Sequence, residues 1–341
     1  GQDAPLFLDL RDRAGWSIEA QNAGDVLPKM SALVAETHLN IRPAKSVDVI
    51  SEGLCLIVGT ADVALPAAEK LQDILGVTVL LTDAAEPPLS RGFDAIRGQL
   101  RSARGALGNF EVTVDALQSL DVTGRDWTWS APRDAGRSEC DVILDLRGET
   151  PLFPAHEKRE GYLRADPGHP PAVAAAVLAA SHLTGTFEQP LYGRTEPLLC
   201  AHSRAGQTGC TNCLDLCPTG AITPDGDHVA IDPMICAGCG ACSSACPSGA
   251  ISYDAPPVDF TMRRVQTLAR AYLEAGGEAP RLMVHDAHGA EMIRLAARHG
   301  RGLPADVVPM ELDALAAFGH AEALAALAAG FAHVSLLLGP K

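Results

Sequence analysis

The chain has 341 residues, 47% of them hydrophobic, so it is long enough for two or three domains with ordinary cores. Its formal net charge of −15 argues against a nucleic-acid partner, because binding to the phosphate backbone needs a basic surface. No uninterrupted apolar run reaches about 18 residues, so we expect no membrane span.

Residues 1–199 are predicted to form a Rossmann-like parallel α/β domain that ends in an irregular segment. A short apolar run over 5–10 predicts a strand, and the pattern of 24–36 predicts a helix. Two further apolar runs, at 54–59 and 77–83, flank an amphipathic helix pattern, which is the β-α-β arrangement. A right-handed crossover should make these two strands parallel.

The turn after the first of these strands lacks the glycine fingerprint of a dinucleotide site. It reads V-G-T-A-D with the single Gly59, where G-x-G-x-x-G would be needed. Asp83, at the end of the second strand, stands where an acid could bind a ribose, but strand ends often carry Asp for capping. Cys55, inside the first strand, is interpreted as a small buried hydrophobe. The pattern therefore favours a Rossmann-like topology without a nucleotide.

A helix is predicted over 93–104, with several arginines on one face that is either solvated or binds an anion. These arginines are Arg91, Arg97, Arg101 and Arg104. Alternation in FEVTV at 110–114 predicts an edge or one-sided strand, and CDVILDL at 140–146 predicts another strand. Residues 147–199 are rich in proline and are predicted to be largely irregular, apart from a helix at about 172–184.

Eight of the ten cysteines lie between residues 200 and 253. Four of them form the C-x2-C-x2-C-x3-C-P run that binds an iron–sulfur cubane, in which the fourth cysteine reaches the neighbouring cluster. The run consists of Cys236, Cys239, Cys242 and Cys246, followed by Pro247. Two-residue spacings let a tight loop direct three thiolates at one cluster, and Gly238 and Gly240 permit the backbone turns.

The first half of this stretch repeats the same unit, with CPTGAIT matching CPSGAIS. Cys210, Cys213 and Cys217 match the last three cysteines of the second half, but Gln207 stands at the position equivalent to Cys236. We assign Cys200, the nearest upstream thiol, as the missing ligand. His202 is a competing ligand, and a three-iron cluster at this site is a third interpretation.

The predicted cofactors are two [4Fe-4S] clusters, each held by four cysteines. The first quartet comprises Cys200, Cys210, Cys213 and Cys246, and the second comprises Cys217, Cys236, Cys239 and Cys242. Structural zinc and disulfides are the alternatives. Zinc sites use paired C-x2-C knuckles, and disulfides need an oxidising compartment. Between the two halves, residues 221–232 predict a hairpin, with its turn at Pro224, Asp225 and Gly226.

Residues 200–253 resemble the dicluster, eight-iron bacterial ferredoxin, with a departure at Gln207. The preceding segment 147–199 is expected to cover the first cluster and exclude water. Further upstream, GNFEVTV at 108–114 resembles a segment of the A subunits of heterodisulfide reductases. Those proteins bind FAD through a glycine-rich fingerprint that this sequence does not carry, so the resemblance implies no flavin.

Residues 257–341 predict a small parallel α/β domain, which follows the ferredoxin-like domain at 200–256. Its layout over 281–338 resembles the small delta subunit of methyl-viologen-reducing hydrogenases, which passes electrons to heterodisulfide reductase. That resemblance implies a docking role, but not the two-iron cluster of that family, because the segment has no cysteine.

A possible metal site in the C-terminal region consists of His285, Asp286 and His288. These residues are interpreted as polar strand-end residues, because no fourth ligand is evident. The sequence stops directly after the apolar run VSLLL, so we expect the natural chain to continue.

These patterns predict an electron-transfer component of a larger cytoplasmic redox complex, with redox partner proteins docking on the flanking domains. One alternative is an oxidoreductase whose N-terminal domain binds a flavin or nucleotide and feeds the clusters. Another is an assembly factor with structural clusters. No Ser-His-Asp arrangement, P-loop or radical-SAM cysteine run is found, so no catalytic residue is assigned and a non-catalytic carrier or subunit is favoured.

Overall fold

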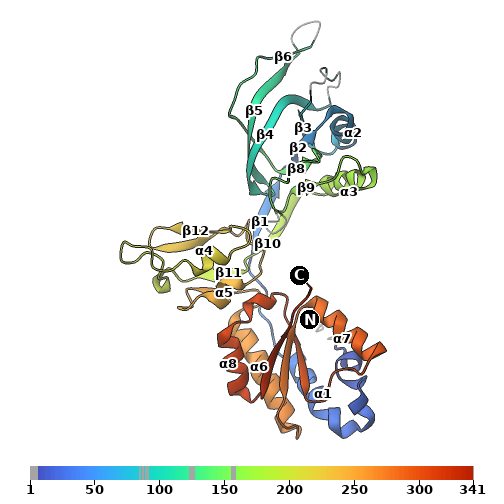
Figure 1. Ribbon diagram of the computed structural model, residues 1–341, viewed down its shortest axis with the longest axis vertical. Coiled ribbons are helices and arrows are strands. Elements are labelled where there is room, and N and C mark those ends of the chain that lie inside the picture. The colour runs from blue at the N-terminus through green and yellow to red at the C-terminus, as the bar shows by residue number, and fades with distance from the viewer. Residues whose placement is uncertain are drawn as a thin grey trace, which may run out of the picture.

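A computed structural model of the chain describes residues 7–83, 86, 88, 92–122, 127–154 and 159–340. The fold is mixed α/β and contains two sheets with parallel strands, which confirms the predicted α/β class with parallel strands. The larger sheet lies at one end of the long axis and the smaller at the other, with residues 200–253, the dicluster segment, beside the junction (Figure 1). Within the described part of the chain, no helix is both long and apolar enough to cross a membrane.

The larger sheet has eight strands in the order β6-β5-β4-β3-β2-β8-β9, with β7 also pairing with β5. Its strands are β2 (Leu54–Gly59), β3 (Gly76–Leu81), β4 (Asp94–Ala106), β5 (Asn109–Asp121), β6 (Thr128–Trp129), β7 (Gly136–Cys140), β8 (Val142–Asp145) and β9 (Tyr162–Arg164). Helices α2 (Ala61–Leu71) and α3 (Pro170–Ser181) pack on one face through small apolar side chains. The sheet and these helices are called the eight-stranded unit.

The predicted β-α-β unit is confirmed, because β2 and β3 flank α2 and run parallel. The strand at 110–114 is confirmed as part of β5, and it is one-sided: Phe110, Val112 and Val114 are buried while Glu111 is exposed. It is not an edge strand, since β4 and β7 pair with it on either side. The strand predicted at 140–146 contains β8.

The helix predicted over 93–104 is wrong, because these residues form β4. Arginines three to four residues apart fit a helix face, but β5 follows after a two-residue turn and supplies hydrogen bonds along the strand. Gly98, inside the predicted range, adopts a φ of +159°, which a helix does not allow. Arg97, Arg101 and Arg104 therefore lie along a strand, and Arg91 lies outside the described residues.

The N-terminal segment packs on the smaller sheet rather than on the larger one. The helix predicted at 24–36 is confirmed as α1 (Ala23–Thr37), and it lies against α6 with an ion pair of 2.8 Å between Arg264 and Glu36. The strand predicted at 5–10 is wrong for its described part, which leads into a π-helical turn at Arg11–Gly15. A 3-10 helix at Ile18–Gln21 lies between this turn and α1.

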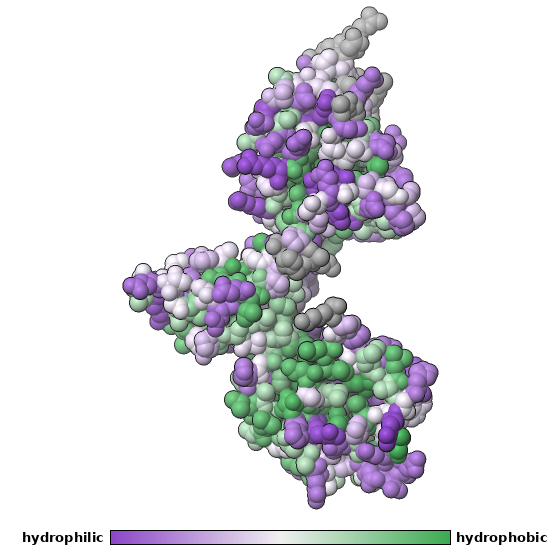
Figure 2. All heavy atoms as spheres, in the orientation of Figure 1, coloured by the Kyte–Doolittle hydropathy of each residue, from purple (hydrophilic) through white to green (hydrophobic). Residues whose placement is uncertain are grey.

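The smaller sheet has three parallel strands in the order β16-β15-β17, which confirms the parallel strands predicted for the C-terminal region. Its elements are α6 (Val258–Glu274), β15 (Arg281–His285), α7 (Ala287–His299), β16 (Val307–Glu311), the 3-10 helix η5 (Leu315–Ala317), α8 (His320–Ala329) and β17 (His333–Leu337). Together with residues 7–37 they form the three-stranded unit. Its surface in Figure 2 is strongly apolar, and exposed leucines on α8 and beside or within β17 include Leu324 and Leu338.

Two small antiparallel sheets lead from the eight-stranded unit to the dicluster segment. They pair β1 (Ser46–Ser51) with β10 (Gly185–Pro190), and β11 (Gly193–Thr195) with β14 (Ile251–Tyr253). Residues 147–199 were predicted to be largely irregular, but they contain β9, α3, β10 and β11. The prediction failed for β10 because its partner lies far away in the sequence; the helix at about 172–184 is confirmed as α3.

Candidate iron–sulfur site

The dicluster segment is built from two similar halves. Each half has a short helix within its cysteine run, α4 (Asn212–Leu216) in the first and α5 (Ala241–Ala245) in the second. The predicted hairpin between them is confirmed as β12 (Ile222–Asp225) and β13 (His228–Ile231). Its turn is shorter than predicted, because Pro224 and Asp225 pair within the strands and only Gly226, with a φ of +63°, and Asp227 turn the chain. The helices contact each other, and the Asn212 side-chain amide donates to the Ala245 carbonyl at 3.4 Å.

Two hollows in this segment are each lined by four cysteines. One hollow is lined by Cys200, Cys210, Cys213 and Cys246. The other is lined by Cys217, Cys236, Cys239 and Cys242. These groups coincide with the first and second quartets, so each half lends its last cysteine to the hollow of the other half. The ligand assignment itself stays a prediction, which this grouping favours.

The walls of the hollows suit an iron–sulfur cluster. Besides thiols, they carry apolar side chains such as Val229 and Ile251, and the described residues that line them include no Asp, Glu, Lys or Arg. Within the described ranges, no three His, Cys, Asp or Glu side chains converge closely enough to hold a single metal ion. A zinc ion needs four ligands about 2.0–2.3 Å from one centre, whereas each thiolate of a cubane binds its own iron. The quartets are therefore wider than a zinc site.

Cys217 and Cys246, the cysteines that cross between halves, lie among hydrogen-bond donors. Burial alone would raise their pKa, but donors outweigh it and hold the pKa of both thiols below the ordinary value. The Thr219 and Ser248 hydroxyls each lie 3.7 Å from the respective sulfur. Backbone amides contribute too, and they occupy equivalent places in CPTGAI and CPSGAI. Both positions thus favour thiolates, the form that binds iron.

Cys242 has the opposite environment, and its neighbours are the rest of its quartet. Burial raises the pKa of this thiol to about 12, and negative charge on Cys236, Cys239 and Cys217 raises it as well. Burial likewise raises the pKa of Cys213 and Cys236. Thiolates gathered in an apolar site repel one another unless positive charge neutralises them. Iron ions bound by the four thiolates would supply that positive charge.

The competing ligand positions at the first quartet differ in their placement. The His202 side chain is buried beside the first hollow, and its Nδ1 lies 2.9 Å from the Cys210 carbonyl oxygen. Because that carbonyl can only accept, the Nδ1–H of His202 donates this hydrogen bond, and Nε2 is the ring nitrogen that the contact leaves available. Gln207 is exposed and does not line the hollow. His202 therefore remains the alternative to Cys200, and Gln207 does not.

The sequence analysis missed two tyrosines at the second hollow. The Tyr192 ring lies so close to Gly238 that a Cβ there would stand 2.6 Å from it, and the Tyr253 hydroxyl donates to the Gly238 carbonyl at 3.1 Å. Tyr192 comes from the segment expected to cover the first cluster, but none of the residues of 147–199 that the structure describes lines the first hollow. That expectation was wrong, since β11 pairs with β14 and carries the neighbouring Tyr192 to the second hollow. No local sequence signal indicates this pairing.

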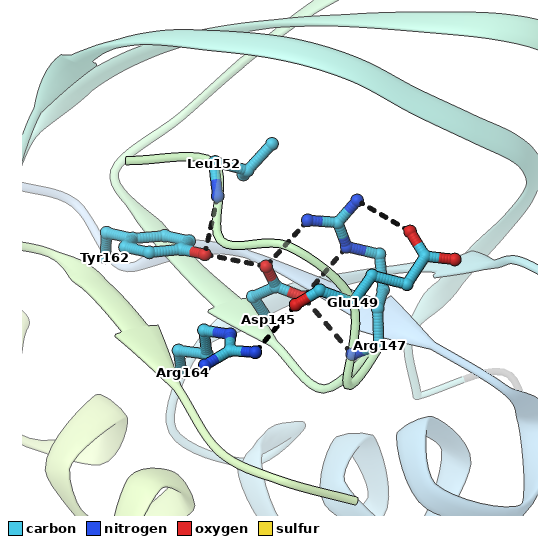
Figure 3. A network of polar contacts seen from close by, with 6 residues as sticks. All are labelled: Asp145, Arg147, Glu149, Leu152, Tyr162 and Arg164. Carbon is cyan, nitrogen blue, oxygen red and sulfur yellow. Dashed lines mark hydrogen bonds and ion pairs between the residues drawn. The ribbon is translucent and has the colours of Figure 1, made fainter. Parts of the chain in front are cut away.

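Asp83, which was weighed as a ribose ligand in the sequence, makes internal contacts in the eight-stranded unit. Both carboxylate oxygens of Asp83 lie 3.3 Å from the Ala61 amide, so Asp83 caps the start of α2. At the end of β8, Asp145 accepts hydrogen bonds from Arg147 and from the Tyr162 hydroxyl (Figure 3). An acid at a helix start opposes phosphate binding there.

The polar cluster at the end of β15 is also explained by backbone contacts. Asp286 caps α7 by accepting from the Gly289 amide at 2.9 Å, and His285 is buried with its Nδ1 2.9 Å from the Asp286 carbonyl. These backbone contacts of His285 and Asp286 fit the interpretation as strand-end residues.

Residues 208–250 match a family model described as a 4Fe-4S dicluster domain. No curated protein matches the chain. The segment is thus a ferredoxin-type domain that supports 4Fe-4S binding and iron–sulfur electron transfer. The match begins after Cys200 and does not extend to the flanking units, so the resemblances to heterodisulfide reductase and to the hydrogenase delta subunit have no support.

Proposed function

We propose that the chain carries two [4Fe-4S] clusters and passes electrons between redox partner proteins, as a component of a larger cytoplasmic complex. The observation that carries this proposal is the pair of hollows, each lined by four cysteines, within a 4Fe-4S dicluster domain. Such clusters supply one-electron chemistry at potentials set by charge, hydrogen bonds to sulfur and solvent exposure.

The residues of the chain then have distinct tasks. The first quartet holds one cluster and the second quartet the other. Cys217 and Cys246 tie each half to the opposite cluster, and the contact between α4 and α5 keeps the two hollows adjacent. Ile222 and Ile251, both buried, keep water from the sulfur atoms on the inner side. Thr219 and Ser248 donate to the crossing sulfurs and so bias the potential of each cluster separately.

We also propose the domain division 1–199, 200–256 and 257–341, with residues 7–37 attached to the third domain by packing. Both flanking domains touch the dicluster segment. From the eight-stranded unit, Arg159 donates to the Thr219 carbonyl at 2.8 Å. From the three-stranded unit, Gly319 lies against Ser244, where an added Cβ would stand 2.7 Å away. These contacts support a docking role for the flanks, which would present partners close to the clusters.

The nucleotide-dependent alternative has no comparable support, because Asp83 already caps the helix start that a phosphate would use. No structural observation favours an assembly factor over an electron carrier.

The test is anaerobic iron and sulfide analysis with EPR spectroscopy of the dithionite-reduced protein, for the wild type, Cys200→Ala and Cys55→Ala. We expect about eight irons in the wild type, about seven or four in Cys200→Ala, and no loss in Cys55→Ala, whose thiol lies outside both quartets. An unchanged iron count in Cys200→Ala would reassign the ligand, with His202→Ala as the next variant. Zinc in place of iron would overturn the electron-transfer proposal.

A further inference from the structure

A cavity of about 710 Å³ lies in the eight-stranded unit, between the first residues of β4, the last residues of β5 and the segment 133–138. Its volume falls within the range of about 300–1,000 Å³ that is typical of small-molecule sites. The other end of the β4–β5 hairpin lies beside the dicluster segment, because residues 105–109 share a hollow with Asp232 and Met234. A ligand in the cavity would therefore occupy the end of the hairpin away from the cysteines.

The cavity is lined by apolar side chains and by two positively charged ones. The apolar lining includes Phe93, Leu117 and Leu120, and the indole ring of Trp127 also lines the cavity. Arg133 and Arg137 supply two guanidinium groups, and Asp94 is the one carboxylate among the described residues that line the cavity. Aromatic rings stack on flat ligands, and guanidinium groups bind carboxylate, sulfonate or phosphate groups through paired hydrogen bonds.

The backbone that carries Arg133 is held firmly in place. Arg133 and Leu117 exchange both backbone hydrogen bonds, at 2.7 and 3.0 Å. On either side, Asp134 accepts from the Ala116 amide at 2.9 Å and Asp115 accepts from the Ala135 amide at 3.1 Å.

The two alanines in these contacts have positive φ angles, 51° for Ala116 and 54° for Ala135. This conformation is unfavourable for residues other than glycine, and it persists where the surrounding contacts enforce it. The reciprocal hydrogen bonds thus fix the direction in which the chain presents Arg133.

Neither arginine is committed to a strong partner. Arg137 makes a loose contact of 3.7 Å with Glu111, and both side chains are largely exposed. Among the described residues, Arg133 forms no ion pair at all. Exposed ion pairs of this kind contribute little stability, so an anion in the cavity would compete for these groups without breaking a strong contact.

We propose that this cavity binds a small organic anion with a flat apolar body, whose anionic group pairs with Arg133 and Arg137. The proposal is independent of the iron–sulfur function, because none of the cavity residues lines either cysteine hollow.

The experiment compares two probes by anaerobic titration calorimetry of the full iron-loaded chain. Naphthalene-1-sulfonate offers a flat body with an anion, and 1-naphthol offers the same body without charge at neutral pH. We expect the wild type to bind the sulfonate at least tenfold more tightly. Arg133→Gln and Arg137→Gln should each remove most of that preference while leaving 1-naphthol binding unchanged, because only the anionic group contacts the guanidinium groups.

Two further variants make the outcome specific. Arg104→Gln removes the same charge near the far end of β4, outside the cavity lining, and should bind both probes like the wild type. Leu120→Ala should weaken both probes equally. No detectable sulfonate binding to the wild type would overturn the proposal, as would equal losses in Arg104→Gln and Arg133→Gln. Thermal unfolding of each variant confirms that it is folded before titration.

Discussion

Gly240 and Ala317 are in contact where the second cysteine loop meets the three-stranded unit. A Cβ on Gly240 would stand 2.9 Å from the Ala317 Cα and would overlap its Cβ. Gly240 also has a φ of +77°. We expect Gly240→Ala to lower the melting temperature of the iron-loaded protein, because it adds both a collision and backbone strain of about 1–3 kcal/mol.

Gly220→Ala is the matched control, since Gly220 has a φ of +66° but open space around its Cβ direction. Gly220→Ala adds backbone strain without a collision, so it should lower the melting temperature less than Gly240→Ala does. The double variant Gly240→Ala/Ala317→Gly should recover part of the melting temperature that Gly240→Ala loses. Equal effects of Gly240→Ala and Gly220→Ala would show that the contact with Ala317 is not tight in solution.

The hydroxyl groups of Thr219 and Ser248 should set the potentials of different clusters. Thr219→Val removes the side-chain donor to Cys217, and Ser248→Ala removes the one to Cys246. Hydrogen bonds to sulfur stabilise the more negative, reduced cluster. We therefore expect each variant to lower one potential by on the order of tens of millivolts, as measured by EPR-monitored redox titration. The two variants serve as controls for each other, and a shift of the same signal in both would contradict the ligand sets.

The sequence predicted those features that depend on short spacings. The cysteine runs, the hairpin turn at Gly226 and the β-α-β patterns are local, so they can be read without knowing the rest of the fold. The repeat also predicts that Cys217 lies with the cysteines of the second half, because the last cysteine of each run reaches the neighbouring cluster.

Features that depend on distant pairing were not predicted. β4 carried a helix-like arginine spacing, and only its pairing with β5 decides its conformation. Tyr192 reaches the second hollow because β11 pairs with β14, and the N-terminal helix α1 packs on α6, over 200 residues away along the chain. None of these pairings leaves a pattern within a short window of sequence.

Cys55 and Cys140 should resist alkylation in the folded chain. Burial raises the pKa of each to about 12, so neither forms the reactive thiolate at neutral pH. After the iron is chelated under native conditions, we expect iodoacetamide to label the exposed Cys239 and the lower-pKa thiols Cys217 and Cys246, while Cys55 and Cys140 react only after denaturation. Peptide mass spectrometry distinguishes them, with the same sample in urea as the control. Rapid labelling of Cys55 in the folded chain would contradict its place in β2.

The pair of Asp145 and Arg147 should stabilise the eight-stranded unit. Both side chains are buried, at 2% and 8% exposure, and burial would raise the pKa of Asp145 if hydrogen bonds from Arg147 and Tyr162 did not hold it below its usual range. Asp145→Asn leaves the Arg147 charge buried without its partner, so we expect a loss of about 3–5 kcal/mol in urea unfolding. Glu149→Gln is the control: its carboxylate is 69% exposed and 3.5 Å from Arg147, so it should cost less than about 1 kcal/mol.

Lys29 should make the three-stranded unit more stable as the pH rises above 8. Its side chain is fully buried, and its Nζ donates to the carbonyl oxygens of Leu303 and Pro304 at 3.2 and 2.7 Å. Burial lowers its pKa from 10.5 to about 8. Below pH 8 both states are protonated and the folded state carries the full cost of a buried charge. Between about 8 and 10.5 the unfolded chain binds more protons, so stability rises with pH, by up to about 3 kcal/mol. Other groups also titrate in this window, so the quantity to compare is the difference in urea-unfolding free energy between variants. Relative to Lys29→Met, the wild type should gain this stability between pH 8 and 10.5, whereas the difference between the wild type and Lys70→Met, whose lysine is exposed, should stay constant. A difference between the wild type and Lys29→Met that does not change with pH would contradict the prediction.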